Sequence, residues 1–309
     1  MSVCSEQPEH TVEALLEGLV IGHRGKGLLV EMQQGTSMLC HTRRRLGCVA
    51  VGDKVVLKQE SGNSAVVERI LPRHSLLLRP GAANRQRVFA ANVDTLCIVT
   101  APEPAADFLL IDQCLVVCEQ NGITAQLIFN KIDLLVEADF ESFQQTFKIY
   151  VDIGYQIIET SIKNGQGIKR LEGSLRHHVS VLTGQSGVGK SSLTSVLLAK
   201  PEIRVGSLSE ASGHGKHTTT SATLYHLPSG GDLIDSPGLA VFGLVGISQQ
   251  QLAWGYREFR PYIERCRFND CKHHLDKGCA VIKAVESGEL TRQRYQRYLK
   301  LFARITANE

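Results

Sequence analysis

The sequence predicts a protein of three parts: an N-terminal β-barrel, a central α/β domain with a mostly parallel sheet, and a C-terminal helical domain that binds a metal. Three observations support this prediction. Short β-leaning runs fill the chain before residue 78, strands alternate with helices from residue 92, and cysteines cluster in a helical region after residue 248. We therefore expect domain boundaries that give residues 1–78, 79–243 and 244–309.

The composition limits the class of protein. The chain has 309 residues, of which 43% are hydrophobic and 21% charged, as in soluble globular proteins, and its net charge is only +3. Nine cysteines, an odd number, and an N-terminus without a signal sequence favour the reducing cytoplasm over a disulfide framework. Because no apolar run approaches the ~20 residues of a membrane span, we expect no membrane contact.

The predicted barrel consists of five β-leaning runs that glycines and polar turns separate. They are Ala14–Val20, Leu28–Met32, Ser37–His41, Lys54–Leu57 and Ala65–Ile70. Short strands at this spacing suggest a small barrel, and the oligonucleotide-binding (OB) fold is a common five-stranded case. Residues 72–91 then indicate a linker, because Pro80 and Gly81 break any helix.

From residue 92 the chain alternates between the two kinds of element. We expect strands at 92–100, 123–129, 156–160 and 179–183, and helices at 107–120, 137–152, 168–177 and 190–199. Further strands at 223–227 and 232–234 follow a loop rich in glycine and threonine, and a last helix covers 289–305. This alternation predicts a mostly parallel sheet with helices on both faces.

A phosphate-binding loop joins one predicted strand to the helix after it. It reads Gly184-Gln185-Ser186-Gly187-Val188-Gly189-Lys190-Ser191, and Ser192 follows. Glycines allow successive backbone N–H groups to face phosphate oxygens, and the helix N-terminus adds a partial positive charge. Lys190 can reach the β- and γ-phosphates, and the Ser191 hydroxyl can bind Mg²⁺. The loop alone predicts a nucleoside triphosphate without specifying its base.

Two further loops are typical of a guanine pocket. The first, Asn130-Lys131-Ile132-Asp133, follows a buried strand and matches NKxD, in which a carboxylate accepts from guanine N1–H and the exocyclic amine. The second, Ser161-Ile162-Lys163 after Thr160, resembles the SAK-type loop that completes the pocket with backbone groups. Taken alone, each match is also compatible with an ordinary polar turn.

The remaining motifs stand in an unusual order. Asp235-Ser236-Pro237-Gly238 matches DxxG, in which the Asp acts on Mg²⁺ through water and the Gly N–H binds the γ-phosphate. Between the phosphate loop and DxxG lie the consecutive threonines Thr218, Thr219 and Thr220, of which Thr219 is the preferred magnesium ligand. The chain therefore runs NKxD, SAK, P-loop, switch threonine, DxxG, a cyclic rotation of the usual GTPase order. Because domain termini often lie close together, such a rotation can preserve the sheet.

A cluster of cysteines and histidines predicts a structural zinc. Cys266, Cys271 and Cys279 offer three thiolates, and either His273 or His274 can complete a closed tetrahedral set. A catalytic zinc would need an open position, which four protein ligands do not leave.

These motifs resemble those of the family of bacterial small-subunit-dependent, circularly permuted GTPases also called YjeQ. The likeness runs over nearly the whole chain and includes GQSGVGKSSL, GKHTTT, DSPG and the metal-ligand spacing. It implies an OB barrel, a permuted GTPase domain and a helical domain with one zinc, and it favours His273 over His274 as the ligand. It also implies a cytoplasmic factor of late 30S maturation that binds rRNA of the small subunit, which stimulates hydrolysis of GTP to GDP.

The charge distribution agrees with an RNA partner. Between residues 11 and 87, twelve lysines and arginines against six acids leave +6, although the whole chain carries only +3. Aromatic side chains for base stacking are nearly absent there, which favours recognition of phosphates and of the shape of folded RNA.

The group that activates water is the least determined part of the predicted site. Leu239 follows Gly238 where Ras-like proteins place a glutamine, so we expect slow turnover alone and take His217 as the internal candidate. We expect a monomer. The rival hypotheses are an RNA-docking protein that uses GTP occupancy as a switch, and a GTPase of another RNA–protein complex.

Overall fold

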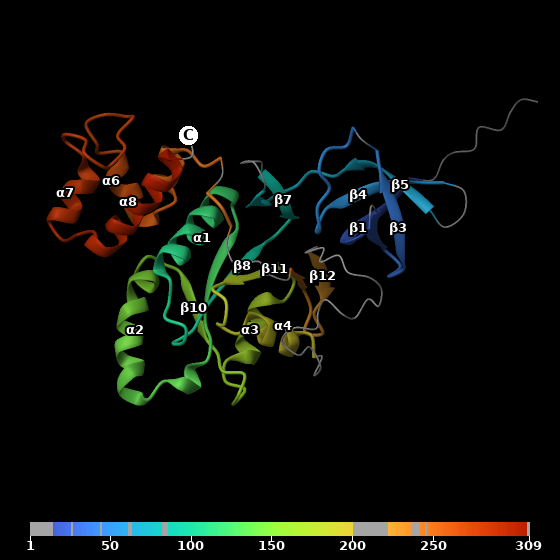
Figure 1. The fold of residues 1–309 in the computed structure, drawn as a ribbon, viewed down its shortest axis with the longest axis horizontal. Helices are drawn as coiled ribbons and strands as arrows, with labels where there is room; N and C mark the ends of the chain where they lie inside the picture. The colour runs from blue at the N-terminus through green and yellow to red at the C-terminus, as the bar shows by residue number, and fades with distance from the viewer. Residues whose placement is uncertain are drawn as a thin grey trace, which may run out of the picture.

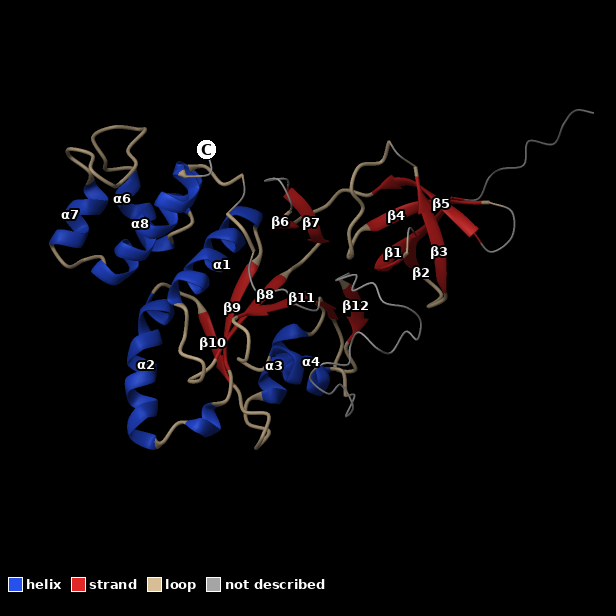
Figure 2. Cartoon of the chain, viewed as in Figure 1, coloured by secondary structure: helices blue, strands red, loops and turns tan. Residues whose placement is uncertain are grey.

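The structure is a computed structural model that describes residues 15–25, 27–43, 45–60, 64–81, 86–199, 222–236, 242–244 and 246–307. Three bodies lie in a row, with the barrel at one end, the α/β sheet in the middle and a helical part at the other end (Figure 1). Strands dominate the first body, helices flank the strands of the second, and helices and loops form the third (Figure 2). The predicted three-part fold class is confirmed.

The N-terminal body is a closed five-stranded barrel. Its strands are β1 (Leu15–Arg24), β2 (Gly27–Met32), β3 (Ser37–Thr42), β4 (Lys54–Gln59) and β5 (Ser64–Ile70). β1 pairs with both β2 and β4, and the ring closes through β3–β5 and β4–β5. Val20, Val30, Val55 and Leu57 are buried at its centre, so the alternating apolar residues of the strands fill the barrel.

A hairpin replaces the linker that the sequence predicts over residues 72–91. Strands β6 (Leu76–Pro80) and β7 (Gln86–Ala91) pair antiparallel, and Leu77 and Phe89 are buried in the core of the central domain. Pro80 and Gly81 exclude a helix here, but the buried apolar residues on either side of them stabilise paired strands. The expected boundary between residues 78 and 79 falls inside β6.

The central sheet has the order β10-β9-β8-β11-β13-β12 and continues into the barrel through β1. Its strands are β8 (Thr95–Thr100), β9 (Thr124–Phe129), β10 (Gln156–Glu159), β11 (Val179–Gly184), β12 (Thr223–His226) and β13 (Asp232–Asp235). All of its pairings are parallel except β12–β13. Two apolar clusters cover its two faces, as the alternation of strands and helices predicts.

Two helices pack on each face of this sheet. α1 (Phe108–Asn121) and α2 (Glu137–Asp152) contribute to one cluster, and α3 (Ile168–Leu175) and α4 (Lys190–Leu197) to the other. A short 3-10 turn, η2 (Ile132–Leu134), follows β9. The carboxyl ends of the parallel strands β8, β9, β10 and β11 therefore meet at one edge, where loops bind ligands in such folds.

The C-terminal body is helical. Its elements are α5 (Gln249–Trp254), η3 (Arg257–Phe259), α6 (Arg260–Ile263), α7 (Ala280–Glu286) and α8 (Arg292–Thr306). They share a core of their own that includes Tyr256, Phe259 and Tyr298. Among the residues described, no helix combines the length and the apolar character needed to cross a bilayer.

Buried ion pairs join the helical body to α1. Asp112, which is fully buried, accepts from Arg294 and from Arg297 at 2.6 Å, and Arg294 also binds Glu258 at 2.7 Å. Near the end of α1, Glu119 accepts from two further arginines of the helical body. Separating the two bodies would leave these carboxylates and arginines without their partners, which is costly for buried charges. The ion pairs therefore hold the helical body against α1.

Candidate nucleotide site and metal centre

The loop between β11 and α4 follows a path that requires glycine. Gly184, Gly187 and Gly189 have φ angles of +138°, +85° and +97°. A Cβ at Gly184 would lie 2.1 Å from the carbonyl oxygen of Val99, and one at Gly189 would lie 2.4 Å from the side-chain nitrogen of Asn130. A curled glycine backbone of this kind can turn its N–H groups toward a phosphate.

A lysine and an aspartate lie at the edge of this loop. Lys190 Nζ donates to the carbonyl oxygens of Gly184 at 2.8 Å and Gln185 at 2.6 Å. Burial lowers the pKa of Lys190, and the charge of Asp235 partly offsets this shift. Burial raises the pKa of Asp235, against the effects of the Ser236 N–H and Lys190. A partly desolvated cation and carboxylate at one edge are suited to bind phosphate and a divalent metal.

The NKxD residues connect three loops. Asn130 is 1% exposed, donates from Nδ2 to the carbonyl of Val188 at 2.9 Å, and accepts from Thr160 Oγ1 at 3.1 Å. Lys131 adopts a left-handed conformation, with a φ of 61°, and its Nζ donates to the carbonyl of Gly187 at 2.6 Å. The base-reading loop therefore holds the phosphate loop directly.

A small cavity lies where the predicted guanine motifs converge. Ser161, which is fully buried, donates its hydroxyl to Asp133 Oδ1 at 2.5 Å and so fixes the carboxylate. Ile132 is buried beneath the loop, and its N–H donates to the carbonyl of Thr160 at 3.3 Å. The cavity measures about 310 Å³, and the residues that line it are Asn130, Lys131, Asp133, Ile162, Lys163, Gly189 and Ser192. Its lining thus combines all three motifs.

The switch region of the predicted site lies outside the described residues. This applies to His217, Thr219 and Gly238, and to the Leu239 on which the prediction of slow turnover depends. Ser191 is described and exposed at the start of α4, and Asp235 ends β13.

Two contacts of the site were not foreseen from the sequence. The Gln185 side chain bridges the phosphate loop to the loop after β8, accepting from the Asp107 N–H at 2.9 Å and donating to the Ala105 carbonyl at 3.0 Å. The Glu103 carbonyl accepts from Lys131 Nζ at 3.0 Å. The sequence does not show which backbone carbonyls form contacts. The part played by the loop after β8 could therefore not be predicted from it.

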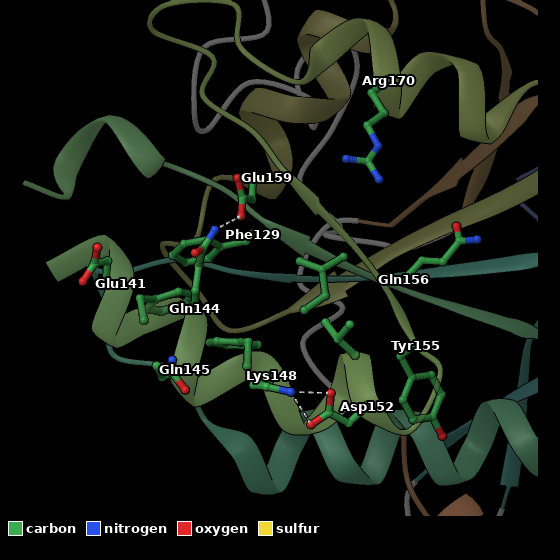
Figure 3. A pocket seen from close by; sticks show the side chains of 14 residues that line it. Phe129, Glu141, Gln144, Gln145, Lys148, Asp152, Tyr155, Gln156, Glu159 and Arg170 are labelled. Atoms are coloured by element: carbon green, nitrogen blue, oxygen red, sulfur yellow. Dashed lines mark hydrogen bonds and ion pairs between the residues drawn. The ribbon is translucent and has the colours of Figure 1, made fainter. Parts of the chain in front are cut away.

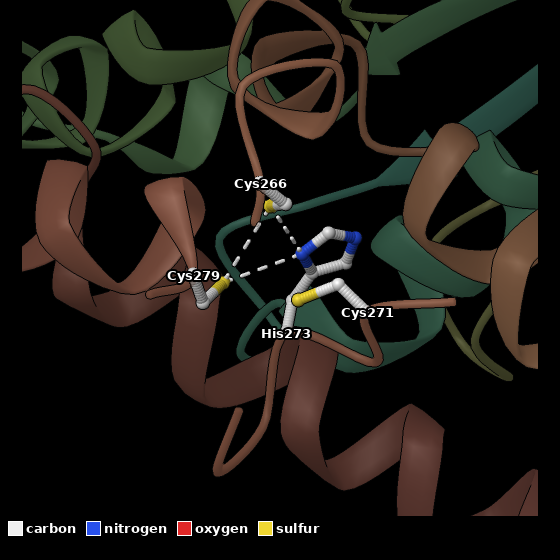
Figure 4. Close-up of side chains that lie close together, drawn as sticks. All are labelled: Cys266, Cys271, His273 and Cys279. Atoms are coloured by element: carbon white, nitrogen blue, oxygen red, sulfur yellow. Dashed lines mark hydrogen bonds between the residues drawn. The ribbon is translucent and has the colours of Figure 1, made fainter. Parts of the chain in front are cut away.

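The cysteine cluster has the dimensions of a tetrahedral zinc site (Figure 4). The ligand atoms of Cys266, Cys271, His273 and Cys279 all lie within 4.8 Å of one another. The sulfurs of Cys266 and Cys279 are 3.9 Å apart, and His273 Nδ1 lies 3.5 and 3.4 Å from them. A tetrahedral ion with Zn–S bonds of ~2.3 Å would place two sulfurs about 3.8 Å apart. Three thiols and one imidazole therefore fit zinc.

The surroundings of the cluster suit its role as a metal site. Burial raises the pKa of the Cys271 and Cys279 thiols and lowers the pKa of His273, which favours the neutral imidazole as a ligand. Tyr295 on α8 donates to the His273 carbonyl at 2.9 Å. The rival His274 is not part of the cluster, and its ring instead packs 5.7 Å from that of Phe302.

The sheet order, the phosphate loop and the guanine cavity define a P-loop GTPase whose motifs are circularly permuted. Comparison with known families agrees, since the model for RsgA GTPase matches residues 70–245. The chain belongs to the RsgA GTPase family.

Relatives over nearly the full length bear the same name. The chain is 44% identical over 289 residues to the small ribosomal subunit biogenesis GTPase RsgA of Haemophilus influenzae, covering 92% of this chain and 84% of that protein. It is 41% identical over 297 residues to a similar protein, RsgA 1, of Vibrio vulnificus, covering 94% and 84%.

Solved structures share the fold. YjeQ from Thermotoga maritima has a TM-score of 0.77 at 31% identity and covers 95% of this chain and 99% of its own. YloQ, described as a circularly permuted GTPase, has a TM-score of 0.75 at 26% identity and covers 98% and 99%.

Proposed function

We propose that this protein acts in biogenesis of the small ribosomal subunit, hydrolysing GTP to GDP and phosphate under stimulation by that subunit. The names of its relatives support the biological role. The observation that carries the chemistry is the cavity in which Asn130, Asp133 and Gly189 meet beside the phosphate loop. A guanine there would lie next to the groups that hold its phosphates.

Each motif has a distinct role in this proposal. The glycine-rich loop and Lys190 bind the phosphates, and Ser191 and Thr219 bind Mg²⁺ directly while Asp235 acts through water. Bound Mg²⁺ supplies positive charge to the β- and γ-phosphate oxygens. Gly238 donates its N–H to the γ-phosphate.

Base selection rests on Asp133. Its carboxylate accepts from two guanine donors that adenine does not present together, while Ser161 holds it in place. Asn130 ties the loops of the pocket, the Lys131 stem lies along the ring, and the backbone at Ile162 and Lys163 completes the pocket.

A polar group must orient the attacking water. Leu239, at the position where Ras-like proteins have a glutamine, is apolar and cannot do so. We assign that role to His217, oriented when the subunit docks. Stimulation by a partner that completes the site can reach ~10³–10⁵-fold in P-loop enzymes.

The C-terminal cluster holds one structural zinc in this proposal, through Cys266, Cys271, His273 and Cys279. We further propose three domains: the OB barrel (1–78), the permuted GTPase domain (79–243) and the zinc-binding domain (244–309). Separate apolar cores in the barrel, the central sheet and the helical part support three domains. Leu77 of β6 lies in the central core, which favours a first boundary before β6 over one at residue 78.

The partner is the rRNA of the small subunit, met in the cytoplasm by a monomer. The barrel supports this assignment, because Arg24, Arg45, Lys54 and Arg69 expose their side chains on it. Arg73 belongs to the basic excess of the sequence but has a structural role, binding the fully buried Asp53 at 2.7 Å.

The decisive experiment measures single-turnover GTP hydrolysis with and without purified small subunits. We expect slow hydrolysis alone and strong stimulation by the subunit. A basal rate that subunits leave unchanged would favour the occupancy-switch hypothesis, and stimulation by a different RNA–protein complex would favour the second rival.

A further inference from the structure

A groove of about 1020 Å³ opens at the end of the central sheet, outside the nucleotide site (Figure 3). Side chains of α2 form one wall, the strand β10 forms the floor, and Arg170 of α3 lies on the opposite side. The groove therefore runs around the edge of the sheet from one covering helix to the other.

The strand at the floor of this groove is the last of the sheet. In the part of the chain that the structure describes, β10 (Gln156–Glu159) pairs with β9 and with no strand on its other side. An edge strand presents alternate N–H and C=O groups that can pair with another chain, and proteins usually cover or twist such an edge. Here the uncovered edge coincides with a groove large enough for a peptide.

The two faces of β10 have different surroundings. Ile157 packs with the apolar cluster of α1 and α2, whereas the next residue, Ile158, packs with that of α3. On the α2 side the rings of Phe129, Phe143 and Phe147 stack, with centroids 3.5 Å apart for the first pair and 4.4 Å for the second. These rings lie mostly in the core, and the wall itself presents the half-buried Phe143 and the exposed Val151. Polar side chains flank them, namely Glu141, Gln144, Gln145, Lys148 and Asp152.

The α3 side carries an exposed arginine. On the α2 side, Lys148 binds Asp152 at 2.7 Å, so its charge is already neutralised. Arg170 is exposed, and no described residue forms an ion pair with it. A carboxylate of a bound ligand could therefore pair with Arg170 on the α3 side.

We propose that this groove binds an extended segment of a partner protein, which adds to the sheet as a strand beside β10. Its backbone bonds the open edge, and its side chains alternate between apolar residues against Phe143 and acidic residues against Arg170. Successive side chains of a strand point to opposite sides of the sheet, so an added strand can contact the α2 side and the α3 side of the groove at the same time. A compact ligand would leave the strand edge unpaired.

The test uses a labelled, acetylated peptide, Val-Glu-Val-Glu-Val-Glu, titrated by fluorescence anisotropy with the full-length protein loaded with GDP. We expect saturable binding. Two further peptides carry N-methyl groups on all valines or on all glutamates. Because only alternate N–H groups of an added strand face β10, one methylated peptide loses binding and the other retains it.

The second part of the test reverses the charge of Arg170. Arg170→Glu weakens binding of this peptide about tenfold or more, and improves binding of Val-Lys-Val-Lys-Val-Lys. Lys169→Glu is the matched control, since it makes the same charge change on the same helix at an exposed residue that does not line the groove. The proposal is overturned if no peptide saturates, if both methylated peptides bind equally, or if Arg170→Glu behaves like Lys169→Glu.

Discussion

Replacing one buried arginine tests how the helical domain is held. Arg294 is 1% exposed and binds both Asp112 and Glu258. In Arg294→Met a chain of similar length fills the space, and Asp112 keeps Arg297 at 2.6 Å, but Glu258 loses contacts at 2.7 and 3.1 Å. Breaking a buried pair costs about 3–5 kcal/mol, and the lower end applies because Asp112 keeps one partner.

The measurement is thermal unfolding followed by circular dichroism. A loss of about 3 kcal/mol corresponds to a lowering of the unfolding midpoint by about 6–12 °C for a unit of 150–250 residues. The matched control is Arg292→Met, which removes an exposed arginine from the same helix and should change stability by no more than about 0.5 kcal/mol. If the two variants unfold at the same temperature, the buried pairs do not hold the domain and the reasoning is wrong.

Four other outcomes are expected. Asp133→Asn weakens GTP binding and shifts preference toward xanthosine triphosphate, because an amide donates where xanthine accepts; competition binding that still favours guanine would contradict this. Chelation releases about one zinc per chain and lowers C-terminal helicity while GTP binding persists, and metal analysis of fresh protein without zinc would refute it. His217→Ala abolishes most of the subunit-stimulated single-turnover rate but leaves GTP affinity nearly unchanged; a wild-type rate would assign the water to another group. Burial lowers the pKa of His226, but hydrogen bonds to Asp232 and Glu31 outweigh this and raise it. The stability from this contact is therefore complete below the unfolded pKa of about 6.5 and is lost as pH rises through the folded value, so the stability advantage of wild type over His226→Gln should shrink in unfolding experiments above that pH.

The sequence predicts best those parts of the fold that short segments determine. The helix expected at 137–152 is α2, and the strand expected at 123–129 differs from β9 by one residue. The guanine and phosphate motifs could be placed because each joins a strand to a helix, and the topology then brings their ends together.

Contacts between distant segments could not be predicted in this way. The pairing of Asp53 with Arg73 depends on how the barrel closes, and the Glu103 carbonyl at Lys131 has no side-chain signal. The sequence of the β6–β7 hairpin indicates a linker because Pro80 and Gly81 break any helix, and the apolar residues around them do not show by themselves that they pair as strands. Local composition does not show that an apolar residue is buried by another domain.

That hairpin has a practical consequence for any attempt to study the barrel alone. A fragment that ended at residue 78 would contain half of β6 without β7, and it would expose Leu77, which is fully buried in the intact chain. Ending the fragment after His74, before β6 begins, would keep the closed ring of five strands together with the Arg73–Asp53 pair, and would leave the hairpin with the GTPase domain. Poor solubility of the longer fragment would then reflect the position of the cut, and not an inability of the barrel to fold.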